Sequence, residues 1–324
     1  MVIVGNENAY AAADKLFSGE RAPHGIVIYG DRGCGKKTLA KYIAAKLLCK
    51  NTSAPCGNCK SCAMIDDDCH PDFVMVKPSL ASGAYRLEDL RNVVSESVTA
   101  PNESEYTVYL IADLDKTPVG AQNTLLKLIE EPPQHVVIIL TACSKEYFLP
   151  TVLSRVVSIG VLPVTKEQCS EYLTKNTKYK QDDINKAVSS MGGNIGMCLE
   201  YLSGSTLRTC CENAEEAALA IASGSEYQLL KVLTVCGKNR ETAETSLKLL
   251  ENIVRDAVML GMGCEGKALG SSEKAARNLA EKYSVKKLGS ICTLPEKYLT
   301  GIKFNASLPA AMGSLCAEIK EITG

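Results

Sequence analysis

The sequence predicts an α/β fold, with a parallel sheet and crossover helices in the first half of the chain and helical domains after it. Two observations support this prediction. Short apolar runs alternate with segments of helical periodicity up to about residue 160, which is typical of a parallel sheet. From Thr165 onward the strand signals stop and helical patterns dominate. We expect an α/β domain over residues 1–162, a small helical domain over 163–206 and an all-α domain over 207–324.

Each element follows from a local pattern. The expected strands are GIVIYG (25–30), DFVMVKP (72–78), YTVYLIAD (106–113) and HVVIILTA (135–142). They are short, apolar and bounded by turn residues. Apolar residues at helical spacing indicate helices over 36–48, 87–98 and 119–131. The last of these should end at Pro132-Pro133, because proline cannot continue a helix.

The composition describes a globular chain of two or three domains, with 324 residues, 46% of them hydrophobic, and a net charge of −1. There is no Trp and only four Phe, so aromatic platforms for stacking on bases are not indicated. The near-zero net charge also argues against broad attraction to nucleic acid. No secretory signal is visible, and no apolar stretch approaches the roughly 20 residues that span a bilayer. We expect a cytoplasmic protein without a membrane partner.

The fifteen cysteines should be reduced in that compartment, which favours metal binding or burial over disulfide bonds. Most of them lie singly, or as one adjacent pair, within helical patterns. There we expect them to be small buried hydrophobic side chains. These are Cys169, Cys198, Cys210, Cys211, Cys236, Cys292 and Cys316.

The stretch GDRGCGKKT, residues 30–38, has the glycine spacing of a phosphate-binding loop between a strand and a helix. The candidate phosphate ligands are the backbone N–H groups of the loop and one lysine, from Gly30, Gly33, Gly35 and Lys36. Lys37 stands where a hydroxyl should ligate magnesium, and Thr38 comes one residue late. An ammonium group cannot coordinate a cation. We therefore predict phosphate binding without metal-assisted hydrolysis.

A neighbouring strand should end in the acids that complete a magnesium site. The candidate is VYLIADLDKT, with Asp113 and Asp115 just past an apolar run. Active enzymes of this class have two adjacent acids here, one that holds magnesium and one that polarises water. In this chain Ala112 precedes Asp113, so only one acid of the pair is in place. This departure also indicates that hydrolysis is lost.

A further candidate site is the stretch CKNTSAPCGNCKSCAMIDDDC, residues 49–69. Its C-x2-C-x2-C core, with a glycine for a tight knuckle, is a strong signal for tetrahedral zinc. The core supplies three ligands, Cys56, Cys59 and Cys62. The spacing leaves the fourth ligand open, because Cys49 and Cys69 both lie seven residues from the core and His70 is a third option. Four protein ligands leave no open position, so the zinc would be structural.

Together these motifs resemble those of the clamp-loader subunits of bacterial DNA polymerase III, which belong to the AAA+ family. The resemblance covers about the first 200 residues. It rests on the loop at 30–38, the cysteine module, HPDF, NTLLKLIEEPP (123–133) and LSRV (153–156). It implies an AAA+ P-loop domain with a zinc module (49–62), a small helical lid and a helical collar through which subunits assemble. It also implies that zinc is bound by Cys49, Cys56, Cys59 and Cys62.

Three departures make the chain resemble the delta prime stator subunits of this family more than its ATP-hydrolysing gamma and tau motors. The motors carry Thr where this chain has Lys37, Asp-Glu where it has Ala112-Asp113, and a phosphate-sensing Arg where it has Gly196. ATP or ADP would then bind weakly or structurally at the loop and would not be hydrolysed. The resemblance therefore implies neither polymerase activity nor robust ATPase activity of the chain itself.

In that family the Arg of a Ser-Arg motif reaches across a subunit boundary to a neighbour's ATP. Carried over, Arg155, preceded by Ser154, would be a trans arginine finger. A guanidinium at that place stabilises charge on the transferring phosphoryl group. The implied partners are the gamma/tau motors, the delta subunit, the beta sliding clamp and primer-template DNA within a circular five-subunit loader.

Two other functions agree with parts of the pattern. An independent gamma/tau-like motor, or another AAA+ ATPase, would hydrolyse ATP with magnesium on its own. A zinc-containing adaptor would bind nucleic acid without nucleotide and with a steep salt dependence. The three departures argue against the first function, and the net charge of −1 argues against the second.

Overall fold

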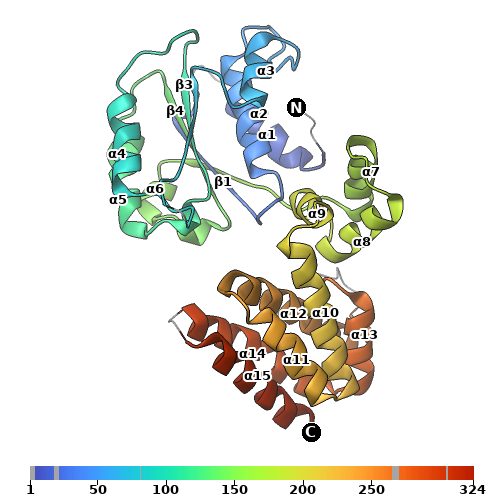
Figure 1. The fold of residues 1–324 in the computed structure, drawn as a ribbon. Helices are drawn as coiled ribbons and strands as arrows, with labels where there is room; N and C mark the ends of the chain where they lie inside the picture. Colours follow the sequence, from blue (N-terminus) through green and yellow to red (C-terminus); the bar gives the residue numbers. More distant parts are fainter. Residues whose placement is uncertain (1–3, 18–21, 81, 265–269, 304–305) are drawn as a thin grey trace. The chain divides into compact units, whose positions relative to one another are not determined.

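The computed structural model describes residues 4–17, 22–80, 82–264, 270–303 and 306–324. The chain divides into two compact units, Met1–Val164 and Thr165–Gly324 (Figure 1). The first unit contains a parallel sheet with helices, and the described residues of the second are helical. The predicted fold class is thus confirmed.

The described residues of the first unit form a five-stranded parallel sheet in the order β2-β3-β4-β1-β5. The strands are β1 Gly25–Tyr29, β2 Phe73–Val76, β3 Thr107–Ile111, β4 Val136–Ala142 and β5 Val157–Gly160. β3 and β4 are buried along their whole length, as expected where helices cover both faces of a parallel sheet. Tyr29 pairs with Ala142 on one side and Gly160 on the other, so three strands end level with one another.

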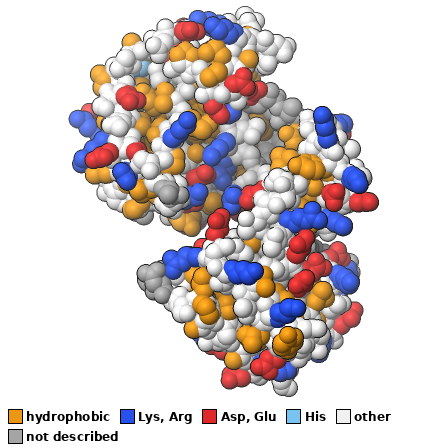
Figure 2. Space-filling view, viewed as in Figure 1, with side chains coloured by type: hydrophobic (Ala, Val, Ile, Leu, Met, Phe, Trp, Pro, Cys, Tyr) orange, Lys and Arg blue, Asp and Glu red, His pale blue; other side chains and the backbone are white. Residues whose placement is uncertain are grey.

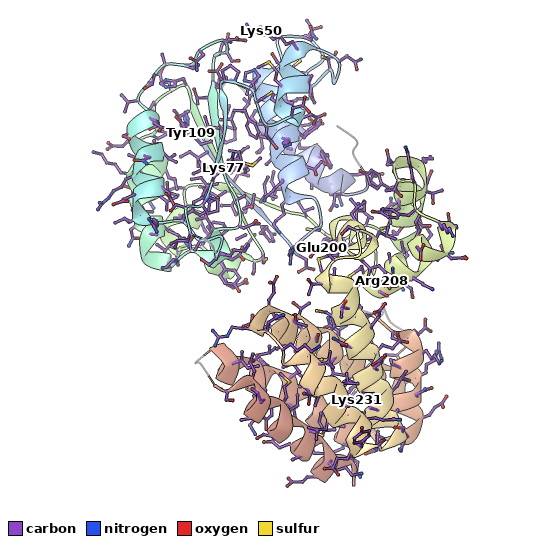
Figure 3. All side chains as sticks on the ribbon, in the orientation of Figure 1. Lys50, Lys77, Tyr109, Glu200, Arg208 and Lys231 are labelled. Atoms are coloured by element: carbon purple, nitrogen blue, oxygen red, sulfur yellow. The ribbon has the colours of Figure 1, made fainter. Side chains whose placement is uncertain are left out.

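Helices cover both faces of the sheet (Figure 1). One layer contains α1 Glu7–Leu16, α2 Lys36–Leu48 and α3 Lys60–Asp66, and the other contains α4 Leu87–Glu96, α5 Val119–Glu130 and α6 Pro150–Leu153. Alternate side chains of β1 enter opposite layers, because Ile26 and Ile28 belong to the core with α2 and Val27 to the core with α5. Tyr109 of β3 is buried on the side of α4 (Figure 3).

The expected helix over 36–48 has those bounds in the structure, and the one over 119–131 ends at Glu130, ahead of the two prolines. In the second unit, α10 spans Thr206–Ser223. Gly204, with a φ of 73°, turns the chain just before it.

The HPD segment before β2 forms a buried turn. The carboxylate of Asp72 accepts hydrogen bonds from the backbone N–H groups of Asn102 (2.6 Å), Glu103 (2.9 Å) and Ser104 (2.9 Å). His70 accepts the N–H of Asp72 through Nδ1, at 3.1 Å. Burial alone would raise the pKa of Asp72, but these hydrogen bonds outweigh it and the pKa is lowered. The carboxylate thereby holds the segment that leads into β3.

The second unit continues with helices in its described residues. They are α7 Lys166–Asn176, α8 Gln181–Met191, α9 Ile195–Leu202, α10, α11 Glu226–Cys236, α12 Arg240–Gly261, α13 Glu273–Lys282, α14 Val285–Lys303 and α15 Leu308–Thr323. Helices α10 through α15 share one apolar core. Arg208 on α10 and Lys231 on α11 are exposed at its surface (Figure 3).

Of the seven cysteines predicted to be buried in the second unit, six are buried and Cys292 is partly exposed. Cys264, which was not among the seven, is exposed. Cys169 of α7 and Cys198 of α9 face one another, with Sγ atoms 3.7 Å apart. These cysteines therefore act as small buried side chains that pack in the helical core, and no reactive role is needed to explain them.

The boundary between the two units falls between Val164 and Thr165 in the sequence. The finer division at 162/163 and 206/207 stays a prediction. Within the described segments, no helix combines the length and the apolar character needed to cross a bilayer. Figure 2 shows basic and acidic side chains interspersed over the visible face, in keeping with the net charge of −1.

The replacement Asp72→Asn should lower the free energy of unfolding by about 2–3 kcal/mol at neutral pH, because three N–H groups lose a charged acceptor. The pKa of Asp72 is lowered by folding. Its contribution is therefore fully present above the unfolded value of about 4 and is lost as the pH falls through the folded pKa. Chemical denaturation at several pH values measures both effects.

Asp67→Asn, at an exposed position in the same segment, is the matched control and should leave the unfolding free energy almost unchanged. If Asp72→Asn unfolds like the wild type at neutral pH, the carboxylate does not hold this segment.

Candidate functional site

The phosphate loop lies at the edge of the sheet where the parallel strands end. Gly30 directly follows β1, Asp113 follows β3 after one residue, and Cys143 directly follows β4. Because the carboxyl ends of parallel strands meet at one edge, residues far apart in sequence come together here. Ligands of open α/β sheets bind at such an edge.

Three glycines with positive φ give the loop its shape. Gly30 has a φ of 150°, and a Cβ on it would lie 2.0 Å from the carbonyl oxygen of Val161. Gly35 has a φ of 101° and open space where its Cβ would be. Gly33, between them, also has a positive φ, 83°. The loop therefore keeps the backbone form and the open space that a bound phosphate group needs.

Lys36 lies across this loop. Its ammonium donates to the carbonyl oxygens of Gly30 (2.7 Å) and Asp31 (2.9 Å), and the residue is buried. An ammonium has three donors, so one is left for a phosphate oxygen. Lys36 thus stabilises the loop and brings a positive charge to it.

Lys37 forms an ion pair with Asp113 across the edge of the sheet. Its Nζ lies 3.3 Å from Asp113 Oδ2, and the two side chains are 53% and 36% exposed. The backbone N–H of Asp113 donates to the hydroxyl of Thr141 (3.0 Å). Thr38, which comes one position late, is half-buried in the first turn of α2. The structure therefore brings together all the residues that the sequence assigns to the phosphate site.

Asp115, the other acid past β3, has a different role. Its Oδ1 accepts the backbone N–H of Cys143 at 3.1 Å, which ties the turn after β3 to the end of β4. Ala112 is buried, and its backbone N–H and carbonyl both bond to the hydroxyl of Tyr85, at 3.1 and 2.9 Å. Ala112, which stands where active enzymes have the first acid, is therefore held by two backbone hydrogen bonds and supplies no carboxylate.

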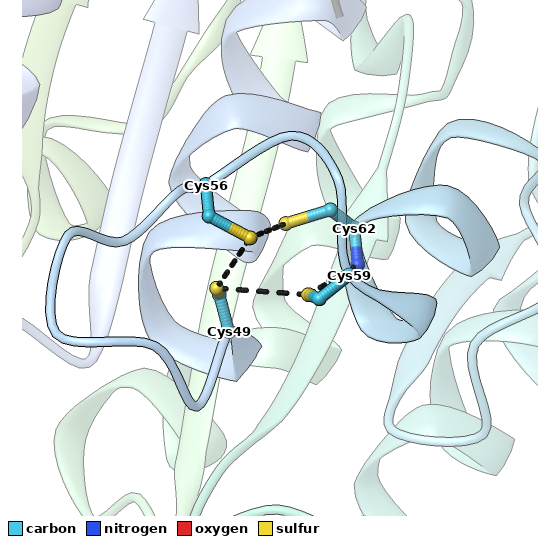
Figure 4. A group of neighbouring side chains, drawn as sticks. All are labelled: Cys49, Cys56, Cys59 and Cys62. Carbon is cyan, nitrogen blue, oxygen red and sulfur yellow. Dashed lines mark hydrogen bonds between the residues drawn. The ribbon is translucent and has the colours of Figure 1, made fainter.

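Four cysteines gather at the end of α2 and the start of α3, as Figure 4 shows. They are Cys49, Cys56, Cys59 and Cys62, and their Sγ atoms all lie within 4.8 Å of one another. Three of the Sγ–Sγ separations are 3.7, 3.8 and 4.0 Å. A tetrahedron with zinc–sulfur bonds of 2.3 Å has edges of about 3.8 Å. The geometry therefore suits one tetrahedral metal ion.

Neighbouring groups donate hydrogen bonds to two sulfur atoms of this cluster. The side-chain amide of Asn51 donates to Cys56 Sγ at 2.9 Å, and the backbone N–H of Cys62 donates to Cys59 Sγ at 3.4 Å. Hydrogen bonds from the N–H of Asn58 and from Asn51 lower the pKa of Cys56, whereas burial raises the pKa of Cys62. The contact of Asn51 is one that no sequence pattern signals.

The alternative fourth ligands lie outside this cluster. Cys69 is exposed, and His70 is buried in the turn with Asp72. Among the described residues, neither belongs to the group of four side chains that could hold a metal ion, whereas Cys49 does.

Arg155 lies just after α6, at the other candidate site. Its guanidinium donates to the carbonyl oxygen of Thr151 (2.9 Å) and to Ser154 Oγ (3.1 Å), and it pairs with Glu130 Oε1 at 3.1 Å. The Arg155 side chain remains 41% exposed. Glu130 is the last residue of α5 and belongs to the LLKLIEEPP motif. The sequence indicates only an ordinary helix end there.

Arg155 and the phosphate loop lie at opposite edges of the sheet. Ile26 pairs with Val157, at the start of β5, and the carbonyl oxygen of Arg155 is 3.9 Å from where a Cβ of Gly25 would be. The loop begins at the other end of β1. The five residues of β1 span about 16 Å, which is beyond the reach of one side chain.

The four-cysteine cluster predicts about one zinc ion per purified chain, measured by plasma mass spectrometry. Cys59→Ser should lose most of the metal and lower the midpoint of thermal unfolding, since the free energy of binding a structural metal contributes to folding. Cys69→Ser is the matched control and should retain both. Stoichiometric zinc in Cys59→Ser would contradict the assignment.

Comparison with known proteins concerns mainly the first unit. A family model described as "DNA polymerase III, delta subunit" matches residues 5–165. The delta prime subunit of DNA polymerase III from Pseudomonas aeruginosa is 35% identical over 136 residues, which are 41% of this chain and 42% of that protein. The gamma/tau subunit from Mycobacterium tuberculosis is 32% identical over 155 residues, 47% of this chain and 27% of that protein. The matched part is less than half the length of either relative.

Among solved structures, a gamma subunit-related protein of DNA polymerase III from Thermotoga maritima has a TM-score of 0.50 and 16% identity. The match covers 98% of this chain and 100% of that one. At this identity the likeness shows a shared fold. The similar identities to delta prime and gamma/tau subunits do not separate these two types. The chain belongs to the DNA polymerase III clamp-loader family that comprises the delta prime and gamma/tau subunits.

Proposed function

We propose that this chain is a delta prime-type stator of a DNA polymerase III clamp loader. It would join gamma/tau motors and a delta subunit in a circular assembly through the helices of residues 207–324. It would place Arg155 at the ATP of the neighbouring motor while the assembly opens the beta clamp on primer-template DNA. Zinc in the cysteine cluster and nucleotide at the phosphate loop would be structural, and the chain would hydrolyse no ATP itself.

The observation that carries this proposal is the position of Arg155 at the edge of the sheet opposite the chain's own phosphate loop. A guanidinium stabilises a transferring phosphoryl group only by direct contact. Because Arg155 cannot reach its own loop, it would act on a nucleotide bound by another subunit. Its partial exposure leaves it accessible for that contact.

The surroundings of Arg155 suit such a role. Glu130, Ser154 and the carbonyl oxygen of Thr151 hold the guanidinium in one orientation before a partner arrives. Part of the conformational entropy of a long side chain is then lost on folding rather than on binding. Glu130 belongs to the motif 123–133 and Arg155 to 153–156, so the two parts of the family resemblance are in contact.

Three positions support the absence of hydrolysis by the chain itself. Lys37 cannot ligate magnesium, Ala112 supplies no carboxylate, and Gly196, in α9, has no side chain with which to sense a phosphate. A gamma/tau-like motor would need all three functions. The isolated chain should therefore show no magnesium-dependent ATP turnover above background.

In a loader reconstituted with its motor and delta subunits, Arg155→Ala should lower DNA- and clamp-stimulated ATP turnover by about a hundredfold or more. Assembly, measured by light scattering, should be unchanged, because the proposed assembly surface is formed by the helices of residues 207–324 and not by Arg155. Arg91→Ala, at an exposed position on α4, is the control and should leave turnover unchanged. A fully assembled Arg155→Ala loader with normal turnover would contradict the proposal.

A further inference from the structure

Two positions at which the chain departs from the motifs of ATP-hydrolysing motors are far apart in the sequence but in contact in the structure. Lys37 occupies the position where a phosphate loop has its metal-ligating hydroxyl, and Asp113 is the acid that is left after β3. Their side chains form an ion pair of 3.3 Å. The ion pair therefore holds the ammonium group of Lys37 at the edge of the sheet where the loop of residues 30–35 lies.

The residues at this edge do not fit a magnesium ion. Magnesium requires close, near-octahedral oxygen ligands and commonly takes one or two protein carboxylates. The hydroxyl is replaced by the ammonium of Lys37, and the first acid by the buried Ala112. The carboxylate of Asp113 is engaged by Lys37, and that of Asp115 by the backbone N–H of Cys143.

The backbone at Asp113 holds the carboxylate in this arrangement. Asp113 has a φ of 55°, in the left-handed region that non-glycine residues seldom adopt. The hydroxyl of Thr141 accepts its N–H, at 3.0 Å, and thereby stabilises this conformation. Strained backbone of this kind is concentrated at functional sites. The pair is thus built from the end of β3, a side chain of β4 and the first turn of α2.

We infer that Lys37 is a built-in cation that replaces magnesium, so that the loop binds the diphosphate group of a nucleotide free of metal. Lys36 and the backbone N–H groups of the loop contact the phosphates, and Lys37 neutralises the charge that magnesium otherwise balances. The inference rests on the phosphate loop of the proposed function and names its ligand. A nucleotide that already carries magnesium places a second cation beside Lys37 and binds less well.

Isothermal calorimetry of the full-length chain with ADP, in excess magnesium and in excess EDTA, tests this inference. The wild type should bind ADP at least as tightly in EDTA as in magnesium. Lys37→Gln keeps the length of the side chain but removes its charge, and should weaken binding in EDTA by about tenfold. Lys127→Gln, at an exposed position of α5, is the matched control and should bind like the wild type.

The double variant Lys37→Thr/Ala112→Asp restores both oxygen ligands. Magnesium should tighten its ADP binding by about tenfold or more, provided that circular dichroism shows a folded chain. Two results overturn the inference: magnesium that tightens ADP binding by the wild type to this extent, or no ADP binding under either condition. Because the isolated chain is measured, these results are independent of the effect of Arg155→Ala in the assembly.

Discussion

The parallel alignment of the strands is the constraint on which the rest of the first unit depends. With β1 paired between β4 and β5, the strand ends at Tyr29, Ala142 and Gly160 are level. This register places the phosphate loop and the turn after β3 at one edge. The same register leaves Arg155 at the opposite edge, beside the start of β1. One sheet therefore separates the loop of residues 30–38 from Arg155, as the proposed stator role requires.

The charges at the two edges follow from this separation. At the carboxyl edge, Lys36 bonds to the loop and Lys37 to Asp113, so the positive charge is held where phosphates would bind. At the amino edge, Glu130 orients Arg155 but leaves part of it exposed. The first arrangement favours nucleotide binding without turnover, and the second favours contact with a neighbour. Both agree with a stator, and neither requires chemistry in the chain's own pocket.

Much of the fold and the membership of the candidate sites could be predicted from the sequence. Continuous apolar runs indicate buried parallel strands, and the glycine spacing at 30–38 indicates the loop, because both patterns have local causes. The fourth metal ligand could not be chosen from spacing, since Cys49 and Cys69 are equally distant along the chain. In the structure, α2 ends at the cluster and brings Cys49, rather than Cys69, next to the other three cysteines. The pairs Lys37–Asp113 and Glu130–Arg155 depend on tertiary contacts that no local pattern encodes.

Electron cryomicroscopy of the assembled loader with a γ-phosphate analogue of ATP tests the central claim most directly. The account predicts the guanidinium of Arg155 within about 3 Å of the analogue in the neighbouring motor, at hydrogen-bond distance. It also predicts that any nucleotide in the chain's own loop has Lys37, and no magnesium, beside its phosphates. An Arg155 that still faces solvent next to Glu130, away from the neighbour's phosphates, would contradict the account.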